Sequence, residues 1–281
     1  MLLFVYRMLA CLPLSVLHGL GRGVGWLLFT CSSRYRRRTL ENARLAGHDS
    51  LAFGRRTAMA AGESIFEVPH VWFRPAAALA KCGTDDWAVV ETAMAEGKGI
   101  LFLTPHIGCF EVAARYVAER NGRMTVLYRP PRKAWMREVV ERGRRSERVD
   151  TAPANLQGVR QLVRALRRNE TIGILPDQVP STGEGVWAPF FGKPAFTMVL
   201  PGRLAKQTGT AVILAAGERL PQSQGWKVHC IRLNTDLPET PEAQAAWLNQ
   251  QLEAIIQRFP EQYLWSYNRY KVPAGVENPP Q

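Results

Sequence analysis

A histidine and a glutamate stand five residues apart where an apolar segment gives way to a helical one. The segment "LFLTPHIGCFEVAARYVAER" spans residues 101–120 and contains His106 and Glu111. The apolar run 99–104 is typical of a buried strand, and 107–120 has the spacing of an amphipathic helix. We therefore expect His106 at the carboxyl end of a strand, beside the N–H groups that start a helix. The dipole of those groups favours a neutral, basic imidazole.

Glu111 is the residue predicted to orient this imidazole. Positions five apart on one helix point about 140° away from each other, so a contact requires His106 to lie before the helix, with Gly108 letting the loop curl back. Glu111 would then accept a hydrogen bond from one ring nitrogen while the other nitrogen takes a proton. A helix cap or a surface contact has the same spacing, so the pair alone leaves both interpretations open.

Other catalytic arrangements are missing from the sequence. It has no GxSxG nucleophile motif and no HExxH metal motif. Cys109 lies close to His106, but nothing else indicates a reactive thiolate, and a small residue packed in the helix is the simpler interpretation. These observations favour a base that deprotonates an external hydroxyl, which then attacks an activated acyl group.

The elements that must position these residues alternate between strand and helix from residue 85 onward. This alternation predicts an α/β fold with a mixed central sheet flanked by helices, and a site where the strands end. Arg129 and Asp177 are expected at two such ends, near that of His106. Asn155 and Thr240 are expected to cap helices. The expected strands are 99–104, 124–129, 171–176, 211–217 and 226–233; the expected helices are 85–97, 107–120, 133–149, 155–170, 197–209 and 240–260.

The N-terminal segment and the charge indicate a membrane surface. Residues 2–30 are mostly apolar, but Arg7, Arg22, Pro13 and several glycines interrupt them. We expect residues 1–33 to form a membrane anchor or interfacial helix, and residues 34–281 one α/β domain. A buried apolar hairpin of the main domain is the alternative.

The net charge of +12 implies an anionic partner. Five scattered cysteines favour a reducing, cytosol-facing compartment over a disulfide framework. Two arginine-rich stretches carry much of the charge: Arg34, Arg36, Arg37 and Arg38, then Arg137, Arg142, Arg144, Arg145 and Arg148.

Several motifs occur in an order that resembles one known family. "HIGCFE" resembles the HxxxxD/E motif of the glycerolipid acyltransferase superfamily. "VLYRPPRK", "GILPDQVP", "GEGVWAPFFGKPAFT" and "PEQYLWSYNRYK" follow in turn. With the apolar N-terminus and "RYRRRTLENARLA", this series resembles the late acyltransferases of lipid A biosynthesis, the lauroyl/myristoyl family. One departure is Pro105, where many superfamily members have asparagine.

The resemblance implies roles for particular residues. His106 and Glu111 would form the catalytic dyad. Arg129 would bind a phosphate or polarise an acyl oxygen, with a surface salt bridge as the alternative. Asp177 would orient Arg129 or bind a substrate hydroxyl, with a turn aspartate as the alternative. A groove for the acyl chain, or else ordinary core packing, is expected from Val186, Trp187, Phe190 and Phe191.

The resemblance also implies the reaction. A fatty acyl chain would pass from an acyl carrier protein thioester to a hydroxyl of a lipid A precursor, with no metal and no cofactor. This would occur on the cytoplasmic face of a bacterial inner membrane, whose anionic lipids fit the basic surface. The alternative is the same chemistry on a lysophospholipid, another glycolipid or an amino-acid lipid. Nucleic acid is not expected as a partner, because aromatic residues hardly interleave with the arginines.

Overall fold

A seven-stranded mixed sheet forms the centre of the protein, as seen in a computed structural model that describes residues 1–131 and 133–279. The strand order is β1-β9-β8-β2-β5-β3-β4, with β9 antiparallel to β8 and the other neighbours parallel. The strands are β1 (Cys82–Gly83), β2 (Ile100–Leu103), β3 (Met124–Tyr128), β4 (Val149–Pro153), β5 (Thr171–Ile174), β8 (Ala211–Arg219) and β9 (Trp226–Arg232). The expected mixed α/β fold is confirmed.

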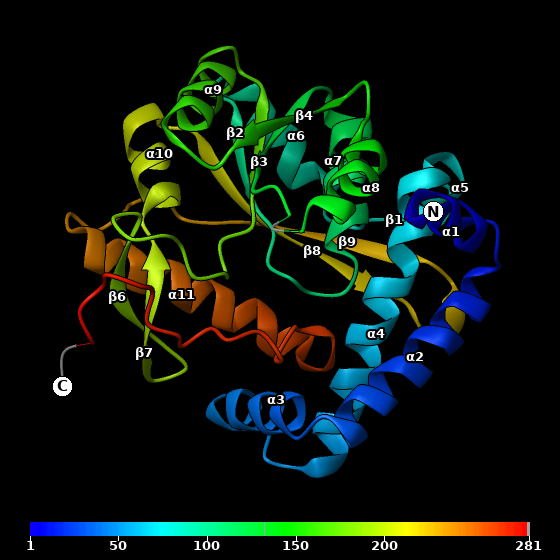
Figure 1. Ribbon diagram of the computed structural model, residues 1–281. Helices are drawn as coiled ribbons and strands as arrows, with labels where there is room; N and C mark the ends of the chain where they lie inside the picture. The colour runs from blue at the N-terminus through cyan, green and yellow to red at the C-terminus, as the bar shows by residue number, and fades with distance from the viewer. Residues whose placement is uncertain (132, 280–281) are drawn as a thin grey trace.

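Helices cover both faces of the sheet because the central strands are apolar on both sides. In β2, Ile100 and Phe102 pack into one core and Leu101 and Leu103 into the other, and all four are fully buried. Figure 1 shows the two helical layers. One contains α6 (Trp87–Ala95) and α7 (Phe110–Asn121); the other contains α9 (Leu156–Arg167), α10 (Leu200–Thr208) and α11 (Pro241–Arg258).

The ends of these helices follow the sequence signals. Asn155 accepts a hydrogen bond from the Gly158 N–H, and Thr240 accepts one from the Ala243 N–H, so both expected caps are confirmed. Short elements complete the fold: α5 (Pro75–Leu79), α8 (Ala134–Arg144), and the turns η1 (Pro221–Ser223) and η2 (Pro260–Gln262).

Two parts of the chain differ from the expected elements. The basic helix predicted over 133–149 ends at Arg144, and the chain continues into the edge strand β4. The segment 185–198 forms a separate hairpin of β6 (Gly185–Phe190) and β7 (Lys193–Met198), which packs on α11. The helix predicted over 197–209 therefore begins only at Leu200, after the hairpin.

The N-terminal segment folds onto the domain instead of forming a separate span. Helices α1 (Leu2–Ala10), α2 (Leu14–Cys31) and α3 (Ser33–Leu45) lie against the long helix α4 (Leu51–Phe73), shown in blue to cyan in Figure 1. Among the residues described, no helix is long and apolar enough to cross a membrane. The expected membrane-anchoring helix is thus not supported as a membrane span. One side of α2 is instead packed against the domain, which is what the alternative of a buried apolar hairpin predicts.

Glycines set the distance between α2 and α4. A Cβ atom on Gly21 would come within 2.6 Å of the Gly62 carbonyl oxygen, and one on Gly25 within 2.2 Å of the Ala58 oxygen. These backbones touch, so no larger residue fits there. Gly23 points away from α4 and has nothing within 4 Å.

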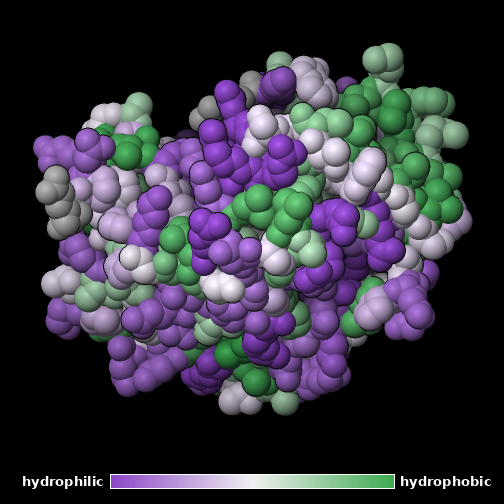
Figure 2. Space-filling view, turned by 90° about the horizontal axis from the view of Figure 1, so that it is seen from below, coloured by the Kyte–Doolittle hydropathy of each residue, from purple (hydrophilic) through white to green (hydrophobic). Residues whose placement is uncertain are grey.

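The opposite side of the N-terminal helices is apolar and exposed. Figure 2 shows hydrophobic side chains gathered at one edge of the molecule, on the side where these helices lie. The residues with large exposed apolar side chains in these helices include Phe4, Val5, Met8, Val16, Leu20, Val24, Trp26, Leu27 and Leu28. A contiguous apolar surface of this kind indicates an interaction site.

Candidate active site

The loop 104–109 carries His106 from the end of β2 to the start of α7. Gly108 has a φ of +51°, and a Cβ atom there would come within 2.1 Å of the Gly217 carbonyl oxygen. Bridges from Ile107 to Tyr263 and from Gly108 to Gly217 hold the loop against the rest of the domain. His106 therefore lies before the helix, as the sequence predicted, in a loop with little freedom to move.

Asp177 is the carboxylate that contacts His106. Its Oδ1 lies 2.8 Å from His106 Nδ1, and its Oδ2 accepts the His106 backbone N–H at 3.0 Å. Burial alone would raise the pKa of Asp177, which is 2% exposed, but the charge and hydrogen bonds of His106 outweigh it and lower that pKa. Asp177 is thus a carboxylate at neutral pH. Because a carboxylate only accepts hydrogen bonds, Nδ1 must carry a proton.

The other ring nitrogen of His106 faces the cavity. In the neutral ring it has a lone pair, since Nδ1 holds the proton. The Gln178 side-chain amide lies 3.1 Å from this Nε2 atom. The amide therefore presents its NH2 group to the lone pair. Tyr267 holds the same loop, because its hydroxyl accepts the Val179 N–H at 3.0 Å.

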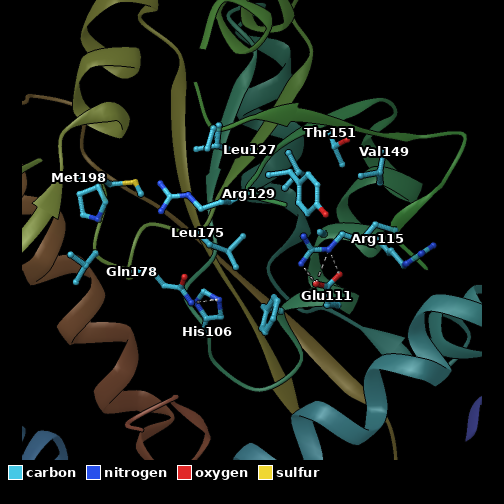
Figure 3. A pocket seen from close by; sticks show the side chains of 18 residues that line it. His106, Glu111, Arg115, Leu127, Arg129, Val149, Thr151, Leu175, Gln178 and Met198 are labelled. Carbon is cyan, nitrogen blue, oxygen red and sulfur yellow. Dashed lines mark hydrogen bonds and ion pairs between the residues drawn. The ribbon is translucent and has the colours of Figure 1, made fainter. Parts of the chain in front are cut away.

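The predicted contact between His106 and Glu111 is not what the structure shows. Arg144 donates to Glu111 through Nη2 and, at 3.1 Å, through Nε, while Trp72 Nε1 donates to it at 2.9 Å. Figure 3 shows the His106 and Glu111 side chains apart. Glu111 lies in the first turn of α7 and turns toward α4 and α8, where Arg144 neutralises its buried carboxylate and Trp72 adds a hydrogen bond.

A cavity of about 240 Å³ connects the two motif residues. Polar side chains in its lining include His106, Glu111, Arg115, Arg129, Arg144 and Gln178. Apolar side chains in the same lining include Phe110, Val126, Leu127, Leu175, Val179 and Met198. Its lining includes His106, Arg129 and Leu175, which follow β2, β3 and β5, so the cavity lies where the alternating pattern predicted the site (Figure 3).

Arg129 lines this cavity, whereas its predicted partner lies elsewhere. It donates to Ser181 Oγ at 3.1 Å and lies 3.4 Å from Glu184, with its side chain 54% exposed. Asp177 binds His106 and has no hydrogen bond to Arg129 among the described residues. The expectation that Asp177 orients Arg129 is therefore wrong, although both side chains follow strand ends as expected.

The proposed acyl-groove residues do not line the cavity. Phe190 is fully buried in the core of the sheet, and Phe191 packs on Trp265. Trp187 packs edge-on against Phe196 and donates to the Glu277 carbonyl. Val186 pairs with Thr197 within the hairpin. These four residues belong to the β6–β7 hairpin, and the structure does not bring them to His106.

Three residues at the site were not singled out from the sequence. Gln178 directly follows Asp177, so its position next to a predicted site residue was the signal that could have identified it. Arg144 was read as one of many surface arginines, because its contact with Glu111 depends on where α8 ends. The hydroxyl of Tyr128, buried at the cavity wall, has no hydrogen-bond partner among the described residues. A bound polar group would supply one.

Cys109 does not have the properties of a nucleophile. Cys109 is buried, and burial together with the Glu67 carboxylate raises the pKa of its thiol well above the usual range. A thiolate is therefore disfavoured there.

Among the residues that the structure describes, no group of three or more His, Cys, Asp or Glu side chains could hold a metal ion.

Known proteins resemble this chain along nearly its whole length. The sequence model of a family described as bacterial lipid A biosynthesis acyltransferase matches residues 1–272. The lipid A biosynthesis lauroyltransferase of Escherichia coli (strain K12) is 26% identical over 280 residues, covering 94% of this chain and 89% of the relative. The lipid A biosynthesis palmitoleoyltransferase of the same organism is 28% identical over 221 residues, covering 76% and 70%. A lipid A biosynthesis acyltransferase of Haemophilus influenzae is 26% identical over 291 residues, covering 98% and 90%.

Proposed function

We propose a specific reaction for this chain, which belongs to the bacterial lipid A biosynthesis acyltransferase family and is therefore an acyltransferase. The resemblance seen in the sequence motifs is thus confirmed. The proposed reaction transfers a fatty acyl chain from an acyl carrier protein thioester to a hydroxyl of a lipid A precursor. The observation that carries it is His106, whose Nδ1 binds a buried carboxylate while Nε2 faces a cavity that is part polar and part apolar.

His106 is the proposed general base, with Asp177 as its orienting carboxylate. Asp177 holds the proton on Nδ1, so the acceptor hydroxyl gives its proton to Nε2 as its oxygen bonds to the thioester carbon. The carbon–sulfur bond then breaks, and Nε2 returns the proton to the leaving thiol. The protein needs no covalent intermediate, which agrees with the buried, protonated Cys109.

Gln178 occupies the position that the acceptor hydroxyl must take. Its amide donates to Nε2 in the free protein, so an arriving hydroxyl displaces it. The released NH2 group remains beside the reacting carbon and can donate to the developing oxyanion. Arg129 also lines the cavity, and its guanidinium suits a phosphate or an acyl oxygen.

Glu111 takes a different proposed role from the one that the motif suggested. Burial would lower the pKa of Arg144, but the Glu111 carboxylate outweighs it and raises that pKa. The pair thereby holds the Arg144 guanidinium at a fixed position in the cavity wall, apart from His106 (Figure 3). We propose that positioning this guanidinium, and not a hydrogen bond to His106, is why the reaction needs Glu111.

The surface fits a lipid acceptor and an acidic donor. The exposed apolar side of α1 and α2, followed by exposed Arg34 and Arg37, supports binding to an anionic membrane, proposed to be the cytoplasmic face of the bacterial inner membrane. Arg137 and Arg142 on α8 are exposed near the cavity and would attract an acidic carrier protein. An acceptor of another class, such as a lysophospholipid, would use the same base.

Mass spectrometry of a reconstituted reaction tests the proposal. Purified protein, an acyl carrier protein thioester and a tetra-acylated lipid A precursor should give a product heavier by one acyl chain. His106→Ala should lose this product, while the control His48→Ala should keep it, because His48 is a half-buried residue bonded to Gln257 and does not line the cavity. His106-dependent acylation of a lysophospholipid, with none of the precursor, would change the acceptor class. Near-normal product formation by His106→Ala would refute the base.

A further inference from the structure

Arg115 is a cation without an ion pair at the edge of the active-site cavity. It lies one helical turn after Glu111 on α7, but the Glu111 carboxylate forms its ion pair with Arg144. Among the described residues, Arg115 donates only to the carbonyl of Gly143 and forms no ion pair. Burial lowers the pKa of Arg115, and the nearby charge of Arg144 lowers it further, against the raising effect of Glu111. A half-buried guanidinium in this state favours an anion from outside the chain.

A second cavity begins on the far side of the same side chain. It has a volume of about 520 Å³ and lies between α5, the end of α7 and residues 145–148. Arg115 lines both cavities, so an extended substrate could enter both. Three arginines and two glutamates line the second cavity, which leaves an excess positive charge. Arg148 is paired with Glu119, whereas the exposed Arg145 side chain has no ion pair within the described residues.

We infer that Arg115 and Arg145 bind a phosphate group of the substrate, with Ser146 as an additional hydrogen-bond donor. The inference rests on the proposed function and adds a subsite to it. Arginine guanidinium groups match the geometry of phosphate oxygens. A phosphate bound here would compensate the unpaired charge of Arg115 and place its carrier beside the cavity of His106.

The location favours the phosphate of the acceptor lipid over that of the donor. The second cavity is bordered by α5, and both α5 and α1 pack against α4. The exposed apolar side of α1 is where a lipid substrate would be held. A phosphorylated sugar headgroup extending from that surface reaches the second cavity first. The donor thioester also carries a phosphate in its prosthetic arm, so the experiment must separate the two sources.

Steady-state kinetics with two acceptors separates them. The probes are a phosphorylated glycolipid acceptor and the same lipid after its phosphates are removed. Arg115→Gln should raise the KM for the phosphorylated acceptor about 10-fold, the usual effect of losing a charged hydrogen bond. Arg145→Gln should raise it roughly 3-fold, because that side chain is exposed. The dephosphorylated acceptor and the donor thioester should show unchanged KM values in both variants.

A matched control and a binding measurement complete the test. Arg164→Gln removes the same charge from an exposed position on α9 and should change no KM. Equal KM increases for both acceptors, or an increase for the donor alone, would overturn the assignment. Binding of the variants to vesicles that contain the phosphorylated or dephosphorylated lipid measures phosphate recognition at the subsite without requiring turnover. Normal phosphate-dependent binding by Arg115→Gln and Arg145→Gln would overturn the subsite, whereas wild-type protein that binds but transfers no acyl chain would overturn only the proposed function.

Discussion

Replacement of Asp177 by asparagine is the sharpest test of how His106 acts. Each carboxylate oxygen of Asp177 accepts one N–H of His106, at 2.8 Å from Nδ1 and at 3.0 Å from the backbone nitrogen. An amide of the same shape has only one oxygen. If that oxygen serves the backbone N–H, the amide NH2 faces Nδ1 and forces the ring proton onto Nε2. The atom that should take the substrate proton is then already protonated.

The expected loss is large because the wrong tautomer removes the base. Asp177→Asn should lower kcat by about 1,000- to 10,000-fold, the effect of the equivalent change in other histidine–carboxylate sites. This corresponds to roughly 4–5 kcal/mol of activation free energy. The assay is the rate of acyl transfer under saturating donor and acceptor, with thermal unfolding of each variant as the control for folding.

A double-mutant cycle shows whether the loss passes through His106. The pair His106→Ala with Asp177→Asn should be no slower than His106→Ala alone, because Asp177 acts only through the ring. Glu111→Gln should slow His106→Ala further, since Glu111 acts through Arg144. Asp177→Asn that keeps more than about a tenth of wild-type kcat would refute the reasoning, given the magnitude expected for such sites. So would a Glu111→Gln effect that disappears when His106 is absent.

Three further predictions concern parts of the molecule outside the base. Gly25→Val should destabilise the fold by about 3 kcal/mol or more in chemical denaturation, because the new side chain meets the backbone of α4, whereas Gly23→Ala should be neutral or stabilising. Cys109→Ala should retain most of the transfer activity, and iodoacetamide at pH 8 should leave Cys109 unlabelled in the folded protein; rapid labelling would contradict its high pKa. Burial would raise the pKa of Glu67, but Arg219 and His18 together hold it at about 2 instead of 4.5, so its contribution is complete above pH 4.5 and is lost as the pH falls toward 2. Glu67→Gln should remove roughly 3 kcal/mol of unfolding free energy at neutral pH and flatten its acid dependence over that range; an unchanged acid dependence would rule out this assignment.

The strands that position the site could be predicted from the sequence because their signals are local. The runs at 99–104, 124–129 and 171–176 are short, apolar and bounded by turn residues, and they form β2, β3 and β5. The edge strand β4 has the sequence "VDTAP", with exposed and polar positions, so it has no such signal. Only its first residue, Val149, fell within a predicted element, the basic helix 133–149, and residues 150–153 were assigned to no element.

Side-chain partners were harder to predict because they depend on elements distant in sequence. Asp177 is 71 residues from His106, and Arg144 is 33 residues from Glu111. The motif places His106 and Glu111 within six residues of each other, which makes a direct contact the natural interpretation. The direction in which Glu111 points is decided by Trp72 on α4 and Arg144 on α8, and neither contact leaves a periodic pattern in the sequence.

The two acidic side chains have different partners. Asp177 binds His106 Nδ1 and so leaves Nε2 toward the cavity, whereas Glu111 binds the Arg144 guanidinium, which cannot lose its proton. Had Glu111 bound His106 instead, Arg144 would stand beside Arg115 with no carboxylate, and two half-buried positive charges would repel each other. The five-residue spacing thus places the two motif residues at separate positions on one cavity, His106 as the proposed base and Glu111 beside Arg144.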